Sequence, residues 1–382
     1  MPADRSDGRR GPAPTAVIVV LDLPVPDDHR VWAQAKALRD DGVAVTVVCP
    51  AAPDRPALST TIDGIDVVYI RAANPARAAT RAAKRTLSGA AGPRMVQACN
   101  PPDLLAGLLR WARRRGYTAV YDQHQVTPAL AQTRRERWLS GYRERRTIRA
   151  ADVVITPSQE QVDRLRARYG REAILVRTAE VDDTAVRTER NGIAPRKTIL
   201  GYLGRIGEHD GLGELIDAVH ELRRRAARDF RLEIAGDGPA LAAVRRKADR
   251  LDVSDLVAFH GWLDPPGVSS FLERIDAMVV PDPDLEFNHY CAMNKVTYAM
   301  ARGLPVVLRP LRENARLVGD SPFLAADLSP GAFADALDAL LLASPRERRE
   351  AGECGRKRYE REFAWDINGP RYLVSVSPGS RA

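Results

Sequence analysis

The chain has 382 residues, of which 45% are apolar and 28% charged, and its formal net charge is +8. This length is greater than that of most single domains, which contain about 100–200 residues, and it suits a protein of two domains. No apolar run approaches the roughly 20 residues that cross a bilayer, so the composition indicates a soluble globular protein. The four cysteines form no cluster with metal-binding spacing, and we expect reduced thiols in a cytoplasmic protein.

The first half of the chain alternates short apolar runs with helical patterns. Residues 1–15 are rich in Pro, Gly and charge, and we expect a disordered tail there. Alternation of this kind is typical of a parallel sheet with crossover helices, so residues 16–180 are predicted to form a Rossmann-like lobe. We expect its strands at residues 16–21, 43–48, 65–70, 94–98, 118–122, 152–156 and 173–177.

Positive charge is concentrated in one part of this lobe. Residues 71–150 carry 17 Lys or Arg against 4 Asp or Glu. Solvated, Arg-rich helix faces are one explanation. The other is a surface that meets anionic lipid headgroups or a phosphorylated lipid acceptor, with Trp111, Trp138 and Tyr142 as interfacial anchors. No recognition motif accompanies the charge, so we do not expect nucleic acid as a partner.

A second lobe follows a change in composition. Residues 181–197 lose apolar periodicity and gather charge, Gly and Pro, so we expect the interdomain linker there. Residues 198–365 are predicted to form a second Rossmann-like lobe, and residues 366–382 a C-terminal return segment and tail. Its strands are expected at residues 198–204, 231–236, 256–261, 277–281 and 305–308.

Glycine-rich loops follow the strands of the second lobe. In "ILGYLGRIGEHDG", residues 199–211, a strand runs into Gly204, Arg205 and Gly207 before a helix begins near Leu212. Such glycines let backbone N–H groups approach a phosphate and Arg205 can bind it, although an ordinary tight turn explains the stretch equally well. The loop "GDGP" at residues 236–239 is interpreted as structural, and Gly261 ends the strand of "FHGW".

The segment "MNKVTYAMARGLPVV", residues 293–307, predicts a helix that ends at Gly303 and leads into a buried strand. Ligands of open α/β sheets bind beyond the carboxyl ends of the strands, where helix N-termini converge. If the two lobes face one another, the chemistry is expected in the cleft between their loops.

The order of these motifs resembles the retaining glycosyltransferases of family four, which have the GT-B fold. "YLGRIG", "LIDAVHEL", "IAGDGP", "VAFHGW", "MNKVTYAMARGLPVV" and "LRENARLVGD" follow that family's order, and "VYDQHQVTPAL" resembles its first lobe. The resemblance covers about residues 16–370. It implies an α/β GT-B protein that transfers a sugar from a nucleotide-diphosphate sugar, usually a UDP sugar, with retention and without a metal or other cofactor.

The resemblance also assigns roles to residues. It places Arg205 on the donor diphosphate, with Lys295 as a second cation, so that both stabilise the departing diphosphate. It places His124 against the transferred sugar. Asp28, His29 and Arg30 are expected on the acceptor side, although the usual Gly-Gly is missing there. The remaining residues expected to line the donor site are Gly204, Gly207, Gly261, Asn294, Tyr298 and Glu313.

Three positions depart from the family pattern. The family commonly has two glutamates in the segment before Gly303, where this chain has Tyr290 and Tyr298. Asp210 stands in place of the loop lysine, and Lys295 is expected to compensate for it. The acidic pair Asp282 and Asp284 is interpreted as part of the loop that lines the donor pocket, not as a metal site.

Three functions remain open from the sequence. One is an active transferase whose partners are a nucleotide sugar, a lipid-linked or small-molecule hydroxyl acceptor, and an anionic membrane surface contacted through residues 71–150. The second is a non-catalytic GT-B protein that assists another transferase, which Tyr290 and Tyr298 favour. A nucleotide-sugar epimerase or hydrolase on the same fold is a third, weaker alternative. An active transferase with a lipid acceptor is expected in the cytoplasm, at the inner face of the membrane.

Overall fold

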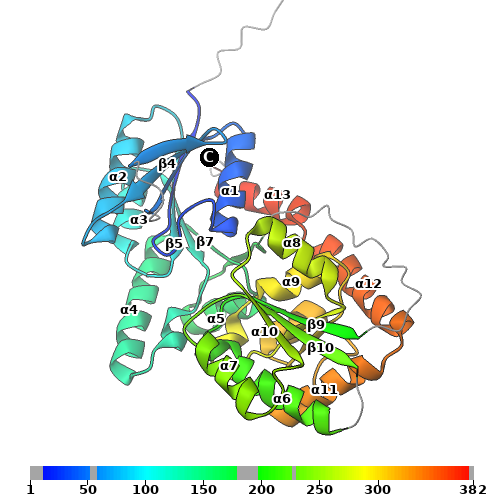
Figure 1. The fold of residues 1–382 in the computed structure, drawn as a ribbon. Coiled ribbons are helices and arrows are strands. Elements are labelled where there is room, and N and C mark those ends of the chain that lie inside the picture. The colour runs from blue at the N-terminus through cyan, green and yellow to red at the C-terminus, as the bar shows by residue number, and fades with distance from the viewer. Residues whose placement is uncertain (1–11, 52–57, 179–196, 226–228, 378–382) are drawn as a thin grey trace, which may run out of the picture. The chain divides into compact units, whose positions relative to one another are not determined.

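A computed structural model describes residues 12–51, 58–178, 197–225 and 229–377 (Figure 1). The chain divides into two compact units, residues 1–181 with 365–382, and residues 182–364. Most of the predicted tail and nearly all of the predicted linker at residues 181–197 lie outside the described residues. No helix among the described residues is long and apolar enough to cross a membrane.

The first unit is built on an eight-stranded sheet with the strand order β3-β4-β2-β1-β5-β6-β7-β8. All neighbouring pairs are parallel except β3 with β4. The strands are β1 (Thr15–Val19), β2 (Ala44–Pro50), β3 (Ser59–Ile62), β4 (Ile65–Ile70), β5 (Arg94–Asn100), β6 (Thr118–Gln123), β7 (Val153–Thr156) and β8 (Ile174–Leu175). The seven strands expected in this lobe are thus confirmed. Strand β3 was not predicted because its residues, "STTI", are mostly exposed at a sheet edge and form no apolar run.

Helices surround this sheet, and one of them arrives from the far end of the chain. They are α1 (His29–Asp40), α2 (Pro75–Gly89), α3 (Ala106–Arg113), α4 (Arg134–Ala150), α5 (Gln159–Tyr169) and α13 (Trp365–Val376). Helix α13 is tied to the sheet because the Tyr372 hydroxyl donates a 2.8 Å hydrogen bond to Gln97. The side chain of Asn368 also accepts a bond from the backbone of Arg177. The last helix therefore belongs to the first unit.

The second unit has a five-stranded, wholly parallel sheet with the order β11-β10-β9-β12-β13. The strands are β9 (Thr198–Leu203), β10 (Phe230–Ala235), β11 (Val257–Gly261), β12 (Ala277–Val280) and β13 (Val306–Leu308), as the sequence predicted. The helices are α6 (Leu212–Arg224), α7 (Leu241–Arg250), α8 (Pro265–Arg274), α9 (Asn294–Ala301), α10 (Arg312–Val318), α11 (Pro330–Leu342) and α12 (Pro345–Glu362).

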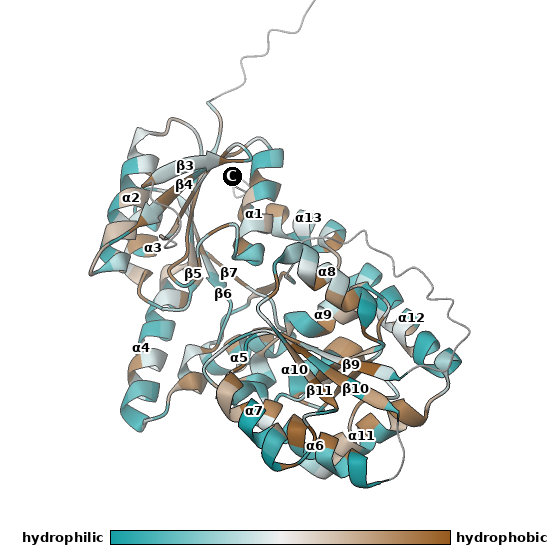
Figure 2. Cartoon of the chain, in the orientation of Figure 1, coloured by the Kyte–Doolittle hydropathy of each residue, from teal (hydrophilic) through white to brown (hydrophobic). Residues whose placement is uncertain are grey.

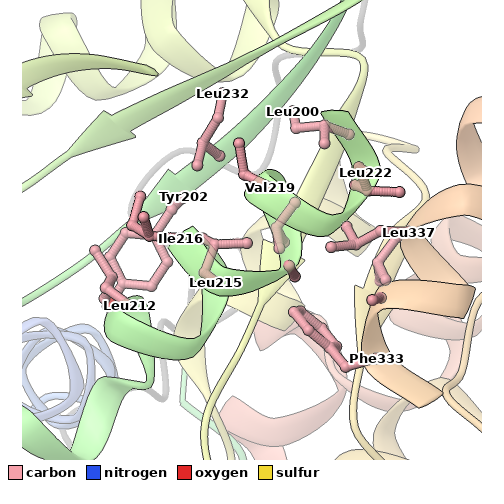
Figure 3. Close-up of a cluster of buried hydrophobic side chains, with 14 of the residues drawn as sticks. Leu200, Tyr202, Leu212, Leu215, Ile216, Val219, Leu222, Leu232, Phe333 and Leu337 are labelled. Carbon is pink, nitrogen blue, oxygen red and sulfur yellow. The ribbon is translucent and has the colours of Figure 1, made fainter. Parts of the chain in front are cut away.

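Apolar side chains from strands and helices close the core of the second unit. The strands are largely hydrophobic, and most helices carry both hydrophobic and hydrophilic residues (Figure 2). Figure 3 shows Ile216 and Val219 of α6 between Leu200 and Leu232 of the sheet and Phe333 of α11, all of them buried. Because this core fixes α6 and the strands before the glycine loops, it holds the carboxyl edge of the sheet in place.

The glycine loops of the second unit approach each other backbone to backbone. The N–H of Gly204 donates to Ala235, and the N–H of Ile206 donates to Asp237. Gly236 has a φ of +138°, and a Cβ atom placed there would lie 1.7 Å from the carbonyl oxygen of Gly204. Glycine is therefore required at residue 236 by close packing, which confirms the structural interpretation of the "GDGP" loop.

We predict that Gly236→Ala destabilises the second unit by about 2–5 kcal/mol, because the added methyl group must displace backbone and adopt an unfavourable φ. Urea unfolding monitored by circular dichroism measures the change. Gly213→Ala, in α6, is the matched control, since a Cβ atom there would meet nothing closer than Lys247 Nζ at 3.9 Å. That variant should be neutral or up to about 1 kcal/mol more stable. Equal stability of the two variants would contradict the close-packing interpretation.

Candidate active site

The carboxyl ends of the five parallel strands place several predicted residues at one edge of the second unit. Gly204 and Gly207 follow β9, Gly261 ends β11, and the first turn of α9 lies in the segment between β12 and β13. The helix predicted from "MNKVTYAMARG" is confirmed as α9, and Gly303 follows it with a φ of +65°.

Lys295, in the first turn of α9, is the best-defined cation at this edge. Its Nζ atom lies 3.1 and 3.2 Å from the two carboxylate oxygens of Asp282 and 3.5 Å from the hydroxyl of Tyr202. It also lies 4.7 Å from the centre of the Tyr202 ring. Burial by itself would lower the pKa of Lys295, but Asp282, Tyr202 and Asp210 outweigh burial and raise it. The ammonium group is therefore charged, and its orientation is fixed by Asp282.

Asp210, which stands where the family has a lysine, lies next to the same ammonium group. One Asp210 oxygen accepts a 2.8 Å hydrogen bond from the backbone N–H of Gly207. The other lies 4.0 Å from Lys295 Nζ. The amine of Lys295 thus lies beside the residue that replaces the loop lysine, and its expected compensation for that lysine stays a prediction.

Arg205 follows Gly204 in the same loop after β9. Its side chain is exposed, and no acidic partner is found for it among the described residues. Its backbone is fixed, because the hydroxyl of Tyr202 donates a 2.6 Å hydrogen bond to the Arg205 carbonyl. Tyr202 therefore contacts the backbone of Arg205 and the ammonium group of Lys295. An anion bound here would meet one exposed arginine and one lysine held by Asp282.

The other predicted donor-side residues differ in accessibility. Asn294 is exposed at the start of α9, Tyr298 is partly buried one turn later, and Glu313 is fully buried in α10. The guanidinium of Arg312 lies 5.1 Å from the centre of the Tyr290 ring, so that tyrosine already has a cationic neighbour.

Asn314, next to Glu313, is a residue that sequence reasoning missed. It is fully buried, and neither its amide nitrogen nor its amide oxygen has a hydrogen-bond partner among the described residues. Buried polar groups are nearly always satisfied, so an orphaned amide indicates a place for an ordered water or a ligand atom. The motif "LRENARLVGD" was the only sequence signal for it.

Asp282 and Asp284 have separate partners. Asp282 binds Lys295, whereas Asp284 binds His289 at 2.7 Å. The segment that carries them is fastened to the glycine loop, because the side-chain amide of Asn288 donates to the carbonyls of His209 and Pro283. These contacts agree with the interpretation of the acidic pair as part of the loop around the donor site.

In the first unit, His124 follows β6 and lies against a buried aspartate. Its Nε2 atom is 3.1 Å from Asp122, although the N–H is not aligned for a hydrogen bond. Burial by itself would raise the pKa of Asp122, but Arg30 and His124 outweigh it and lower the pKa well below its usual range. The backbone N–H of His124 also donates a 2.6 Å bond to Asn100. His124 is thus held on both sides and is 15% exposed.

The residues expected on the acceptor side lie at the same edge of the first unit. Asp28 caps α1 by accepting a 3.0 Å hydrogen bond from the N–H of Val31, and His29 is partly buried. Arg30 is buried, and its guanidinium binds Asp122 at 2.8 and 3.0 Å and the carbonyl of Val176 at 2.7 Å. Its donors are committed to these partners, so Arg30 is better suited to fixing Asp122 than to binding an acceptor.

Cys99, Asp122 and His124 bring their ligand atoms within 4.8 Å of one another. They suit a metal poorly, because the guanidinium of Arg30 already occupies Asp122 and a metal would add a second cation there. Burial and Asp122 also raise the pKa of the Cys99 thiol, which disfavours the thiolate that a metal requires.

Two family models match the chain. The model described as Glycosyltransferase Family 4 matches residues 29–178, and the model described as Glycosyl transferases group 1 matches residues 197–343. The matched segments contain all the catalytic candidates, His124, Arg205 and Lys295.

Curated relatives include GDP-mannose-dependent enzymes. The chain is 26% identical over 283 residues to the alpha-(1-6)-phosphatidylinositol dimannoside mannosyltransferase of Mycobacterium tuberculosis, with 71% of each chain covered. It is 28% identical over 304 residues to the corresponding monomannoside mannosyltransferase of Mycolicibacterium smegmatis, covering 74% of this chain and 75% of that one. An alpha-D-kanosaminyltransferase of Streptomyces kanamyceticus matches 37% of this chain at 30% identity.

Solved structures share the fold at low identity. A sucrose-phosphate synthase from Thermosynechococcus elongatus superposes with a TM-score of 0.77 at 17% identity, covering 94% of this chain and 97% of that one. A glycosyltransferase of lipopolysaccharide biosynthesis, WaaG, gives 0.69 at 17% identity, covering 95% and 100%. The expected α/β class is thereby confirmed, and the chain belongs to the group 1 glycosyltransferases of family four, with the GT-B fold.

Proposed function

We propose that this glycosyltransferase transfers a hexose, with mannose as the first candidate, from a GDP-sugar to a hydroxyl group of a lipid-linked acceptor. The observation that carries the proposal is the pair of cations, Arg205 and Lys295, at the carboxyl edge of the second unit. Such groups stabilise the charge that develops on a departing diphosphate. We further propose that the reaction retains the anomeric configuration and needs no metal ion, as the family resemblance implies.

The choice of base and acceptor rests on the relatives. The UDP sugar expected from the sequence has less support than a GDP-sugar, because the mannosyltransferases that cover over 70% of the chain use GDP-mannose and phosphatidylinositol mannosides. A small-molecule acceptor is the alternative, which the shorter match to a kanosaminyltransferase favours. Incubation with GDP-mannose and a lipid extract, followed by mass spectrometry of the lipids, tests the activity. Absence of any glycosylated lipid would contradict a lipid acceptor.

We predict that Arg205→Ala weakens GDP binding about 10- to 100-fold and slows transfer about 10- to 1000-fold, because a charge-assisted contact to the diphosphate is lost. Calorimetry and a radiolabelled transfer assay measure the two effects. Arg224→Ala is the matched control, since Arg224 is an exposed arginine at the far end of α6. Unchanged affinity and turnover in Arg205→Ala would remove this residue from the site.

Lys295 needs a different design, because its removal leaves Asp282 buried and unpaired, which destabilises the fold. The double variant Lys295→Met with Asp282→Asn removes both charges together. We predict that this variant folds but binds GDP about 10- to 100-fold more weakly than the native protein. Native-like GDP affinity in a folded double variant would contradict the role of Lys295.

Tyr298 decides between an active transferase and a non-catalytic binding protein. If it replaces the missing acid beside the ribose, Tyr298→Glu should keep or tighten GDP binding, because the ribose gains two charged acceptors near the helix N-terminus. Tyr298→Phe should weaken binding only a few-fold, since it removes one hydroxyl. Calorimetry with both variants tests this. A lower melting temperature of Tyr298→Glu without measurable GDP binding would favour the non-catalytic protein.

A membrane contact through α4 would bring a lipid acceptor to the protein. Trp138 and Tyr142 are 70% and 48% exposed, their rings stack 5.9 Å apart, and exposed arginines flank them. We predict that the protein sediments with acidic vesicles at low salt and less at high salt. Trp138→Ala with Tyr142→Ala should weaken this binding, whereas Trp262→Ala, at a 78% exposed residue of the second unit, should not. Failure to bind acidic vesicles at low salt would favour a small-molecule acceptor.

A further inference from the structure

Three helices of the first unit end together at the edge of the sheet opposite His124. Helix α3 ends at Arg113, α4 at Ala150 and α5 at Tyr169, close to the starts of β6 and β7. His124 follows the opposite end of β6. The six residues of this strand span about 20 Å at roughly 3.3 Å per residue, which separates His124 from the helix ends. Groups gathered at this edge are therefore separate from the residues assigned to sugar transfer.

A pocket of about 600 Å³ opens between these helix ends. Its lining contains a single acid, Asp152, which forms a 2.8 Å ion pair with Arg113. A second pocket of about 570 Å³ shares Arg113 and Asp152 and adds Arg110 and Arg114. The arginines that line the first pocket are Arg113, Arg145, Arg149, Arg168 and Arg171.

Some of these arginines form hydrogen bonds to backbone carbonyls, and others have no acidic partner among the described residues. Arg171 donates to the carbonyls of Ala151 and Asp152, and Arg113 donates to the carbonyl of Arg149, so both satisfy the end of α4. Arg145 and Arg149 are exposed and have no acidic partner among the described residues. On α12, by contrast, the chain pairs exposed arginines with glutamates one turn away, as in Arg346 with Glu350.

Four arginines around the pockets, none with an acidic partner in the described part of the chain, have a spacing that is unfavourable without a counter-ion. Arg145 and Arg149 lie one turn apart on α4, and Arg110 and Arg114 lie one turn apart at the end of α3. Like charges at this spacing repel by about 0.2–0.5 kcal/mol per pair. The negative ends of the helix dipoles attract cations here, but only weakly at an exposed helix end. An excess of positive charge therefore faces the pocket.

We propose that this arginine-lined pocket binds a phosphate-bearing anion at a site distinct from the donor site. Guanidinium groups bind phosphate oxygens in a bidentate manner, and arginines on two helices and a loop can surround one or two phosphates. A soluble polyphosphate and the headgroup of a phosphomonoester lipid share this chemistry. Binding would tie α3, α4 and the segment after α5 together.

Inorganic pyrophosphate is the probe, titrated calorimetrically at low salt. The native protein is expected to bind at two sites, one of which is weakened by Arg205→Ala. Arg145→Gln with Arg149→Gln should weaken the other about 10- to 100-fold, because two charge-assisted contacts are lost. Arg134→Gln with Arg135→Gln is the matched control, which removes the same charge from the exposed first turn of α4 and should leave both sites intact.

Vesicles of phosphatidylcholine with added phosphatidic acid distinguish the two sources of phosphate. If the vesicles displace pyrophosphate from the native protein through Arg145 and Arg149, the site takes a lipid headgroup, and if they do not, it takes a soluble anion. Equal pyrophosphate affinity in the native protein and both double variants would overturn the proposal. So would the absence of any binding beyond the site that Arg205→Ala weakens, and neither result bears on the donor site.

Discussion

The ion pair between Lys295 and Asp282 is the interaction on which the donor site depends. It links the first turn of α9 to the loop after β12, and Tyr202 of β9 lies against the same ammonium group. A buried ammonium is stable only with such partners. Asp210, which stands in place of the glycine-loop lysine, lies 4.0 Å from the same ammonium group. A diphosphate arriving here would meet a charge that the fold has already oriented, so little reorganisation is needed.

In the first unit, a buried anion is held by a cationic partner, as the buried Lys295 is held by Asp282 in the second unit. Asp122 is a buried anion held by Arg30 and Gln34, and His124 lies beside it. Its hydrogen bonds extend to Gln97 and, through it, to Tyr372 of the returning helix α13. The residue that the family resemblance places against the sugar is thus supported by a network that includes helix α13.

Much of the fold was predictable from the sequence, and the contacts within the site were not. All the strands of the second unit and α9 follow from apolar runs and from Gly303, since buried parallel strands and helix ends leave local signals. Edge strand β3 has no such local signal in the sequence, because it forms no apolar run. Arg30 was expected on the acceptor side. The sequence alone does not show that Asp122, 92 residues further along, lies next to Arg30 in space. Asn314 was recognised only in the structure, as a buried amide without a hydrogen-bond partner among the described residues.

The most direct measurement is calorimetric titration of the native protein with GDP and with UDP under matched conditions. A donor site built on Arg205 and Lys295, with Tyr298 in place of the ribose-binding acid, should bind GDP measurably and more tightly than UDP. Tighter binding of UDP would contradict the proposed base. Absence of binding by either nucleotide would contradict the donor site itself and would leave a GT-B protein that acts by binding a partner.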